Sequence, residues 1–222
     1  MNKGIFKFLL TLLIFNLFSL NLVYGNNLNT EKNIIIYSLN NFFTDYYSCL
    51  TKLETKDLSS YFRNITDEEK DSYNLLYESL RLEVNVLIAD NDINGRYNKS
   101  IYTYYNDIKS FKTSNNFTVV SLNQEVKITN FQKTNTVYKE YTIKLVKSNN
   151  KYLISTIDSN SYYVEILKNI TPKNGNYRES ADLYFNETKN LMNKNDSSST
   201  SGDDNPFSLK NILNYVTKMF SK

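Results

Sequence analysis

The spacing of hydrophobic residues changes near Gly95, and this change constrains the fold more than any other feature of the 222-residue chain. Before Gly95 they recur at intervals of three and four, which is the period of a helix with one apolar face. After Gly95 many alternate with polar residues, as in a strand with one buried face. Helices grouped before antiparallel strands indicate an α+β domain. We therefore expect two long N-terminal helices packed on a curved antiparallel sheet of three to four strands.

Two long helices are predicted, over residues 30–53 and 67–90, with a short helical piece over 57–62 between them. Thr66 and Glu69 have the spacing of a capping box at the start of the second helix. Turn-forming residues between 90 and 95 predict its end. The first apolar stripe consists of Ile35, Leu39, Phe42, Phe43, Tyr46, Leu50 and Leu53, and the second of Tyr73, Leu76, Tyr77, Leu80, Val84, Leu87 and Ile88.

Strands are predicted by alternation and by β-branched and aromatic residues. Asn149 and Asn150 form a tight hairpin turn between the last two, because Asn tolerates positive φ. The run 161–167 is either a further edge strand or a loop, and 178–192 is a modest helix. The strands cover 100–111, 117–129, 137–147 and 151–157; Val120, Leu122, Val126 and Ile128 share one face of the second, and Tyr141, Ile143 and Leu145 share one face of the third.

Residues 1–25 have the pattern of an export signal: a basic start, an uncharged apolar run and small or modest residues before the cleavage point. Cleavage between Gly25 and Asn26 predicts a secreted or envelope-associated protein. The alternative is an uncleaved anchor, because a spanning helix needs about 20 apolar residues and this run nearly reaches that length, although two Asn interrupt it. A buried core helix is the third possibility.

The rest of the chain divides into an α+β domain over 26–168, a helical extension over 169–193, a disordered linker over 194–206 and a basic amphipathic helix over 207–222. The last helix has three possible surfaces: its own domain, an anionic membrane interface or the groove of a protein partner. Its apolar stripe and basic residues are Leu209, Lys210, Ile212, Leu213, Val216, Lys218, Met219 and Phe220.

The composition argues against most catalysis, because the chain has no His and a single cysteine, Cys49. Cys–His pairs, Ser–His pairs and most zinc sites are thereby removed, and we expect no catalytic, cofactor or metal residues, although carboxylate, Tyr or Lys chemistry stays open. Cys49 is expected to be a buried small hydrophobe, the alternative being a reactive thiol. Asp45 and Asp107 lie closest to aromatic residues and are interpreted as solvated surface charges. Removing the signal lowers the net charge from +3 to +1, which does not suggest a nucleic-acid partner.

Two stretches resemble the NTF2-like (SnoaL-like, cystatin-like) family. Residues 39–58 resemble its first helix, in which an aromatic helix is followed by a short acidic-hydrophobic turn of helix, and 138–158 resemble its closing hairpin, with Tyr152 where the family usually has Trp. The resemblance implies a cone whose open end often holds a ligand. The concave wall would then include Tyr141, Ile143, Tyr152 and Ile154; alternatively, these side chains fill a closed core against the helices.

A closer resemblance is to the NTF2-like N-terminal region of secreted clostridial and bacillar proteins that carry an amidase domain. Residues 177–184 are similar to the opening of that amidase domain, but the Cys and His expected after it are missing. The resemblance implies a secreted, non-catalytic accessory or binding domain at the bacterial cell envelope, which binds wall material or forms a homodimer through its sheet. The alternatives are a small-molecule-binding or weakly catalytic NTF2-like protein, and a membrane-surface protein that uses its C-terminal helix.

Overall fold

The computed structural model describes residues 30–94, 100–114, 116–129, 134–149, 151–173 and 175–196. The chain divides into two compact units, residues 1–41 and 42–222, and the division falls within the first helix, residues 30–52. In the described part of the first unit Ile35 and Leu39 are buried, as their stripe predicted, and Tyr37 is exposed. The predicted export signal and the predicted amphipathic helix lie outside the described residues.

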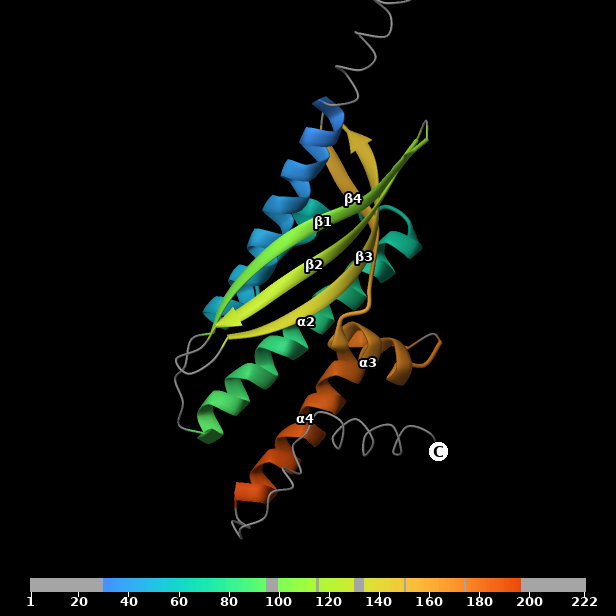
Figure 1. Cartoon of the computed structure of the whole chain (residues 1–222). Helices are drawn as coiled ribbons and strands as arrows, with labels where there is room; N and C mark the ends of the chain where they lie inside the picture. The colour runs from blue at the N-terminus through green and yellow to red at the C-terminus, as the bar shows by residue number, and fades with distance from the viewer. Residues whose placement is uncertain are drawn as a thin grey trace, which may run out of the picture. The chain divides into compact units, whose positions relative to one another are not determined.

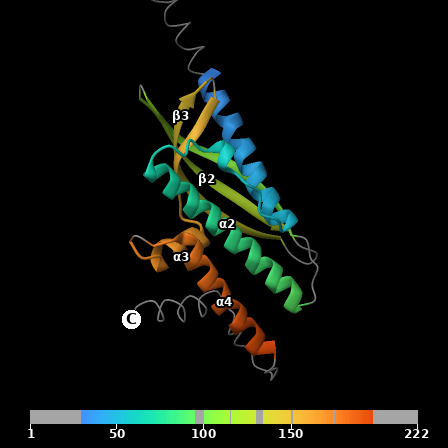
Figure 2. The same cartoon turned by 180° about the vertical axis from the view of Figure 1, so that it is seen from behind.

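The second unit confirms the α+β class, and its arrangement is consistent with an NTF2-like cone. Its four strands form one antiparallel sheet in the order β1-β2-β3-β4 (Figure 1). Helix α2 lies on one face of this sheet (Figure 2) and contacts β4, α3 and α4. After residues 42–52 of the first helix, the elements are η1 (Ser59–Tyr61), α2 (Asp67–Asn94), β1 (Ile101–Thr113), β2 (Thr118–Thr129), β3 (Thr134–Ser148), β4 (Lys151–Ser159), α3 (Tyr162–Ile170) and α4 (Tyr177–Asp196).

The capping box at the start of α2 is confirmed. The backbone N–H of Glu69 donates to Oγ1 of Thr66 at 3.3 Å, and the N–H of Thr66 donates to Oε2 of Glu69 at 3.1 Å. Helix α2 ends at Asn94, within the turn-forming residues 90–95 that predicted its end and four residues beyond the approximate bound of 90. Ala89 is buried one turn before that end.

The sheet has the predicted inner face. Val120, Leu122 and Val126 of β2 are buried, as are Tyr141, Ile143 and Leu145 of β3. The β3–β4 hairpin closes at the predicted turn: Ser148 pairs with Lys151, and Asn149 has φ 46°. Strand β1, whose alternation is poor in sequence, pairs with β2 along its length, with a register shift between Ile108 and Ser110.

Residues 161–167 are neither a strand nor a loop, because they lie mostly in α3. Aromatic and β-branched residues make this run resemble a strand, but Val164, Ile166 and Leu167 are buried on a helix instead. The short helical piece expected over 57–62 is only the 3₁₀ turn η1. Ile88 is 36% exposed and so lies at the margin of the α2 stripe.

Two of the predicted segment boundaries lie in described helices. The boundary at residue 168 lies within α3, and the predicted linker over 194–206 begins within the last turn of α4, its remainder lying outside the described residues. None of the helices that the structure describes is long and apolar enough to cross a membrane.

Candidate functional site

A row of three polar side chains crosses the inner face of the sheet. Asn106 of β1 pairs with Gln124 of β2, which in turn pairs with Lys139 of β3. Gln124 has no exposed surface, and its Nε2 donates to Oδ1 of Asn106 at 2.7 Å. Sequence analysis missed Gln124, although alternation with Leu122 and Val126 places it on the buried face. A buried amide destabilises the fold unless it is hydrogen-bonded. The amide oxygen of Gln124 therefore needs a donor from the helix that covers this face.

Tyr47 of the first helix supplies that hydrogen bond. Its hydroxyl donates to Oε1 of Gln124. Its ring lies over two tyrosines of β1, with centroids 6.0 Å from Tyr102 and 5.2 Å from Tyr104, at interplanar angles of 20° and 27°. Tyr102 and Tyr104 reach the same ring because residues two apart on a strand share a face. Thr44 fixes the edge of this stack through a 2.9 Å hydrogen bond with the Tyr104 hydroxyl.

Lys139 brings a positive charge to the same aromatic group. Its Nζ lies 5.4 Å from the ring centroid of Tyr47 and 5.8 Å from that of Tyr46. Both separations are within the range in which a cation is attracted to the face of an aromatic ring. The two tyrosines thus hold the Lys139 ammonium on the inner side of the sheet.

Glu83 of α2 is the acidic residue of this region, and sequence analysis missed it too. Burial raises the pKa of its carboxyl, and the positive charge of Lys139 opposes that rise. The carboxyl has no hydrogen bond or ion pair within 4.0 Å to any residue that the structure describes. Its position between Leu80 and Leu87 on the helical stripe was the available signal.

The residues Tyr46, Tyr47, Glu83, Tyr102, Gln124 and Lys139 are called the Glu83 cluster below. Burial is the largest cause that raises the pKa of Tyr46, Tyr47 and Tyr102. The charge of Glu83 raises the pKa of each further. These hydroxyls therefore stay protonated at neutral pH and act as hydrogen-bond groups rather than as bases. Chemically, the cluster offers one carboxyl that no described residue hydrogen-bonds, one ammonium and several aromatic faces.

The predicted pocket wall is only partly in this region. Tyr141 is buried beside the cluster, with its ring centroid 5.0 Å from that of Phe43. Tyr152 and Ile154 of β4 are buried elsewhere: Tyr152 lies under Lys147, whose Nζ is 5.9 Å from the ring, and Ile154 pairs with Leu145.

Ile143, the fourth predicted wall residue, is buried between Val120 and Ile157, its register partners on β2 and β4. A ligand wall at Tyr141, Ile143, Tyr152 and Ile154 stays a prediction.

The other acidic and sulfur candidates are not members of the Glu83 cluster. Asp45 accepts hydrogen bonds from Nζ of Lys56 at 2.8 Å and from the Tyr61 hydroxyl at 2.6 Å, and these lower its pKa. Asp107 is exposed and pairs with Lys109. Cys49 is buried, and burial raises the pKa of its thiol. Within the described ranges, no three Cys, Asp or Glu side chains gather as metal ligands would.

The chain matches no protein-family model, and a search of curated proteins finds no match. Solved structures similar to it include Rv3472(D26N), a protein of unknown function from Mycobacterium tuberculosis, with a TM-score of 0.37, 10% identity, and coverage of 73% of this chain and 93% of that one. A scytalone dehydratase-like protein from Novosphingobium aromaticivorans has a TM-score of 0.33, 13% identity, and coverage of 60% and 91%. Likenesses at this level say nothing about what the chain binds or catalyses.

Proposed function

We propose that the chain is an exported, non-catalytic binding module of the cell envelope, whose Glu83 cluster receives a small ligand that carries an amine or another strong hydrogen-bond donor. The observation that carries this proposal is the Glu83 carboxyl, which is partly buried and has no hydrogen-bond partner among the described residues. Withdrawing such a group from water is costly unless it gains a partner. A ligand that donates to Glu83 supplies that partner.

The charges of the cluster favour a cationic ligand. A carboxylate beside aromatic faces is a suitable environment for an ammonium group. Lys139 already occupies the region against Tyr46 and Tyr47, so a second cation is expected at Glu83 rather than over those rings. A ligand that also carries an acceptor can bind Glu83 and Lys139 together.

Binding is favoured over catalysis because the cluster lacks an activated base. The chain has no His, and burial raises the pKa of Tyr46, Tyr47 and Tyr102 away from neutrality. A general base works best with a pKa near the working pH. Of these groups, only Glu83 has its pKa moved toward neutrality, and a single carboxyl suffices to orient a ligand.

The test uses ethanolamine and glucosamine as cationic probes, with glucose and acetate as uncharged and anionic controls. Calorimetric titration of the full chain should show binding of the cationic probes and about tenfold weaker binding by Glu83→Gln, since a lost charged hydrogen bond is worth at least ~1.4 kcal/mol. Glu179→Gln removes an exposed carboxylate on α4 and should bind like the wild type. Equal binding by Glu83→Gln and the wild type would reject the Glu83 site.

The envelope location rests on the predicted signal over residues 1–25 and on the resemblance to amidase-associated N-terminal regions. Fractionation of cells that express a C-terminally tagged chain should place the mature protein, beginning at Asn26, outside the cytoplasm. Finding it in the cytosol at full length contradicts the location. Co-sedimentation with anionic liposomes, comparing the full chain with one that ends at Asn205, tests whether residues 207–222 bind membranes, and equal binding excludes that role.

A further inference from the structure

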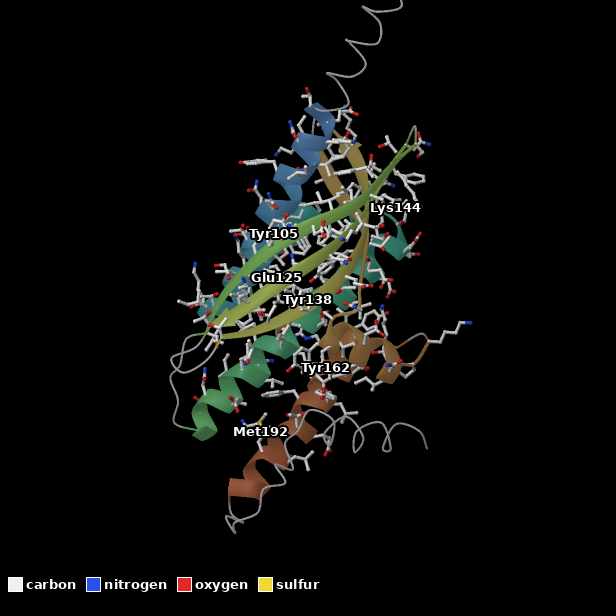
Figure 3. The ribbon with its side chains drawn as sticks, viewed as in Figure 1. Tyr105, Glu125, Tyr138, Lys144, Tyr162 and Met192 are labelled. Carbon is white, nitrogen blue, oxygen red and sulfur yellow. The ribbon has the colours of Figure 1, made fainter. Side chains whose placement is uncertain are left out.

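Two exposed tyrosines flank a carboxylate in one row on the outer face of the sheet. Tyr105 of β1 pairs with Glu125 of β2, which pairs with Tyr138 of β3. Figure 3 shows the three side chains on adjacent strands. Tyr105 is 68% and Tyr138 is 72% exposed, and neither has a hydrogen bond or ring contact with any residue that the structure describes. We call Tyr105, Glu125 and Tyr138 the tyrosine row.

The register sets the separation of the two rings. Neighbouring strands lie about 4.8 Å apart, so the residues of β1 and β3 in one row are separated by roughly 10 Å. The twist between neighbouring strands, about 20–25°, rotates the Tyr138 position by roughly 40–50° relative to that of Tyr105. The tyrosine row is therefore a twisted two-ring surface rather than a flat one.

The surroundings of the rings are polar and carry both signs of charge. Nζ of Lys127 lies 3.2 Å from Oε1 of Glu125, in the middle of the face. Mixed charge of this kind does not suit a polyanion, which requires a basic surface. Hydroxyl, amide and charged groups are well suited to hydrogen-bond a polyhydroxylated chain. The two rows beside the tyrosine row are Thr103–Lys127–Thr136 and Asp107–Asn123–Glu140.

We propose that the tyrosine row binds a single strand of the β-1,4-linked glycan of the cell wall. The C–H groups on the flat face of a β-linked sugar pack against the negative face of an aromatic ring. In a β-1,4-linked chain every second sugar repeats its orientation, over a length close to the separation of the two rings. Alternate sugars then lie on Tyr105 and Tyr138, and the sugar between them lies over Glu125 and Lys127.

A second copy of the chain is the competing occupant of this face. Closing two sheets face to face would bury Glu125, Lys127, Asp107 and Glu140 of both copies, whereas charged residues are depleted in the cores of protein interfaces. A hydrated glycan leaves these charges in contact with water and hydroxyl groups. The charge pattern thus favours the glycan.

The glycan proposal takes its polymer from the proposed envelope location but uses the face of the sheet opposite the Glu83 cluster. Tyr104, whose ring stacks on Tyr47, and Tyr105 are consecutive on β1 and therefore point to opposite faces. Variants of the two sites can accordingly be tested separately. Glu83→Gln should bind wall glycan like the wild type.

The experiment measures co-sedimentation of the full chain with purified peptidoglycan, and NMR titration with soluble glycan strands released from it. Tyr105→Ala and Tyr138→Ala should each weaken binding about tenfold, the loss expected for one stacking contact of ~1.4 kcal/mol. Tyr138→Phe keeps the ring and should retain most of the affinity. Tyr37→Ala is the matched control, because Tyr37 is 69% exposed on the first helix, and it should bind like the wild type.

Several outcomes would overturn the glycan proposal. These are equal binding by wild type and Tyr105→Ala/Tyr138→Ala, an equal loss in Tyr37→Ala, or binding to flat crystalline chitin or cellulose but not to single wall strands. A further contradicting outcome could come from sedimentation velocity. A wild-type dimer that becomes monomeric in the tyrosine variants would show that the outer face of the sheet binds a second copy of the chain. Binding of purified strands by a chain that stays in the cytosol supports the tyrosine row and rejects only the envelope location.

Discussion

Ser155 of β4 donates a hydrogen bond of 2.8 Å to Oε1 of Glu69, 86 positions earlier in the chain. Oε2 of the same carboxylate accepts the N–H of Thr66 in the cap of α2 and the N–H of Ile65, and Nε of Arg63 lies 2.9 Å from Oε1. One buried carboxylate therefore joins the start of α2 to the edge of the sheet. Local capping chemistry and a long-range contact stabilise the same residue.

Replacing Glu69 with Gln should destabilise the fold. The neutral amide keeps the shape but loses the charge that Arg63 and the two backbone N–H groups stabilise. Hydrogen bonds to a charged group contribute roughly 1.5–3 kcal/mol, so we expect a loss of about 2 kcal/mol in urea unfolding. Glu68→Gln, which changes an exposed neighbour, should stay within about 0.5 kcal/mol of the wild type. A similar loss in both variants would contradict the role of Glu69.

Glu69 should also make stability fall in acid. Burial alone would raise its pKa, but hydrogen bonds from Thr66, Ser155 and Ile65 and the charge of Arg63 lower it to about 2. The folded pKa is below the unfolded value of about 4.5, so the stabilisation is complete above pH 4.5 and is lost as pH falls toward 2. The contribution of Glu69 to the free energy of unfolding should fall by about 3 kcal/mol. Urea unfolding from pH 6 to pH 2 should show this loss in the wild type but not in Glu69→Gln.

Glu83 should have the opposite effect. Burial raises the pKa of its carboxyl in the folded protein, so ionisation destabilises the fold as pH rises above the unfolded value. Glu83→Gln should therefore be more stable than the wild type at pH 8, and this gain should shrink as pH falls to 4. Chemical denaturation at the two pH values measures it. A gain that is the same at both pH values would show that ionisation of Glu83 is not its cause.

Two residues of the predicted α2 stripe should differ sharply in their contribution to stability. Leu80 has no exposed surface, whereas Ile88 is 36% exposed. Leu80→Ala should cost about 3 kcal/mol, the typical cost of a cavity in a packed core, while Ile88→Ala should cost less than about 1 kcal/mol. Comparable losses in thermal unfolding would contradict the burial difference.

Cys49 should be unreactive in the folded protein. The side chain is buried, and burial raises the pKa of the thiol and so lowers its thiolate fraction. Ellman's reagent should label it only in urea, at the rate at which the chain unfolds. Rapid labelling of the native protein would instead indicate an accessible thiol.

The spacing of hydrophobic residues predicted whether each long element is a helix or a strand, because an element that is buried on one face has hydrophobic residues at regular intervals. The buried residues of the first helix, Phe42 through Leu50, and the inner face of β3 are examples. The prediction is wrong where local residue types contradict the packing. The aromatic and β-branched run in α3 has strand composition but docks as a helix.

The Glu83 cluster was not predicted, because polar residues in apolar stripes are normally assigned to solvent. Gln124 and Glu83 both have the spacing of their buried neighbours, and periodicity places them on the inner side. Tyr47, which donates to Gln124, and Lys139, whose charge acts on Glu83, lie 77 and 56 positions away from these residues along the chain. Which of these polar groups meet depends on how the helices pack on the sheet, and no local pattern in a single sequence gives that packing.

The register shift between Ile108 and Ser110 affects the tendency of the protein to aggregate at high concentration. Strand β1 lies at an edge of the sheet, where a straight run of backbone amide groups would be a template for further chains. The shift leaves Lys109 without a register partner in β2 and interrupts that run with a positive charge. One irregular residue thereby makes this edge of the sheet a poorer template for edge-to-edge aggregation.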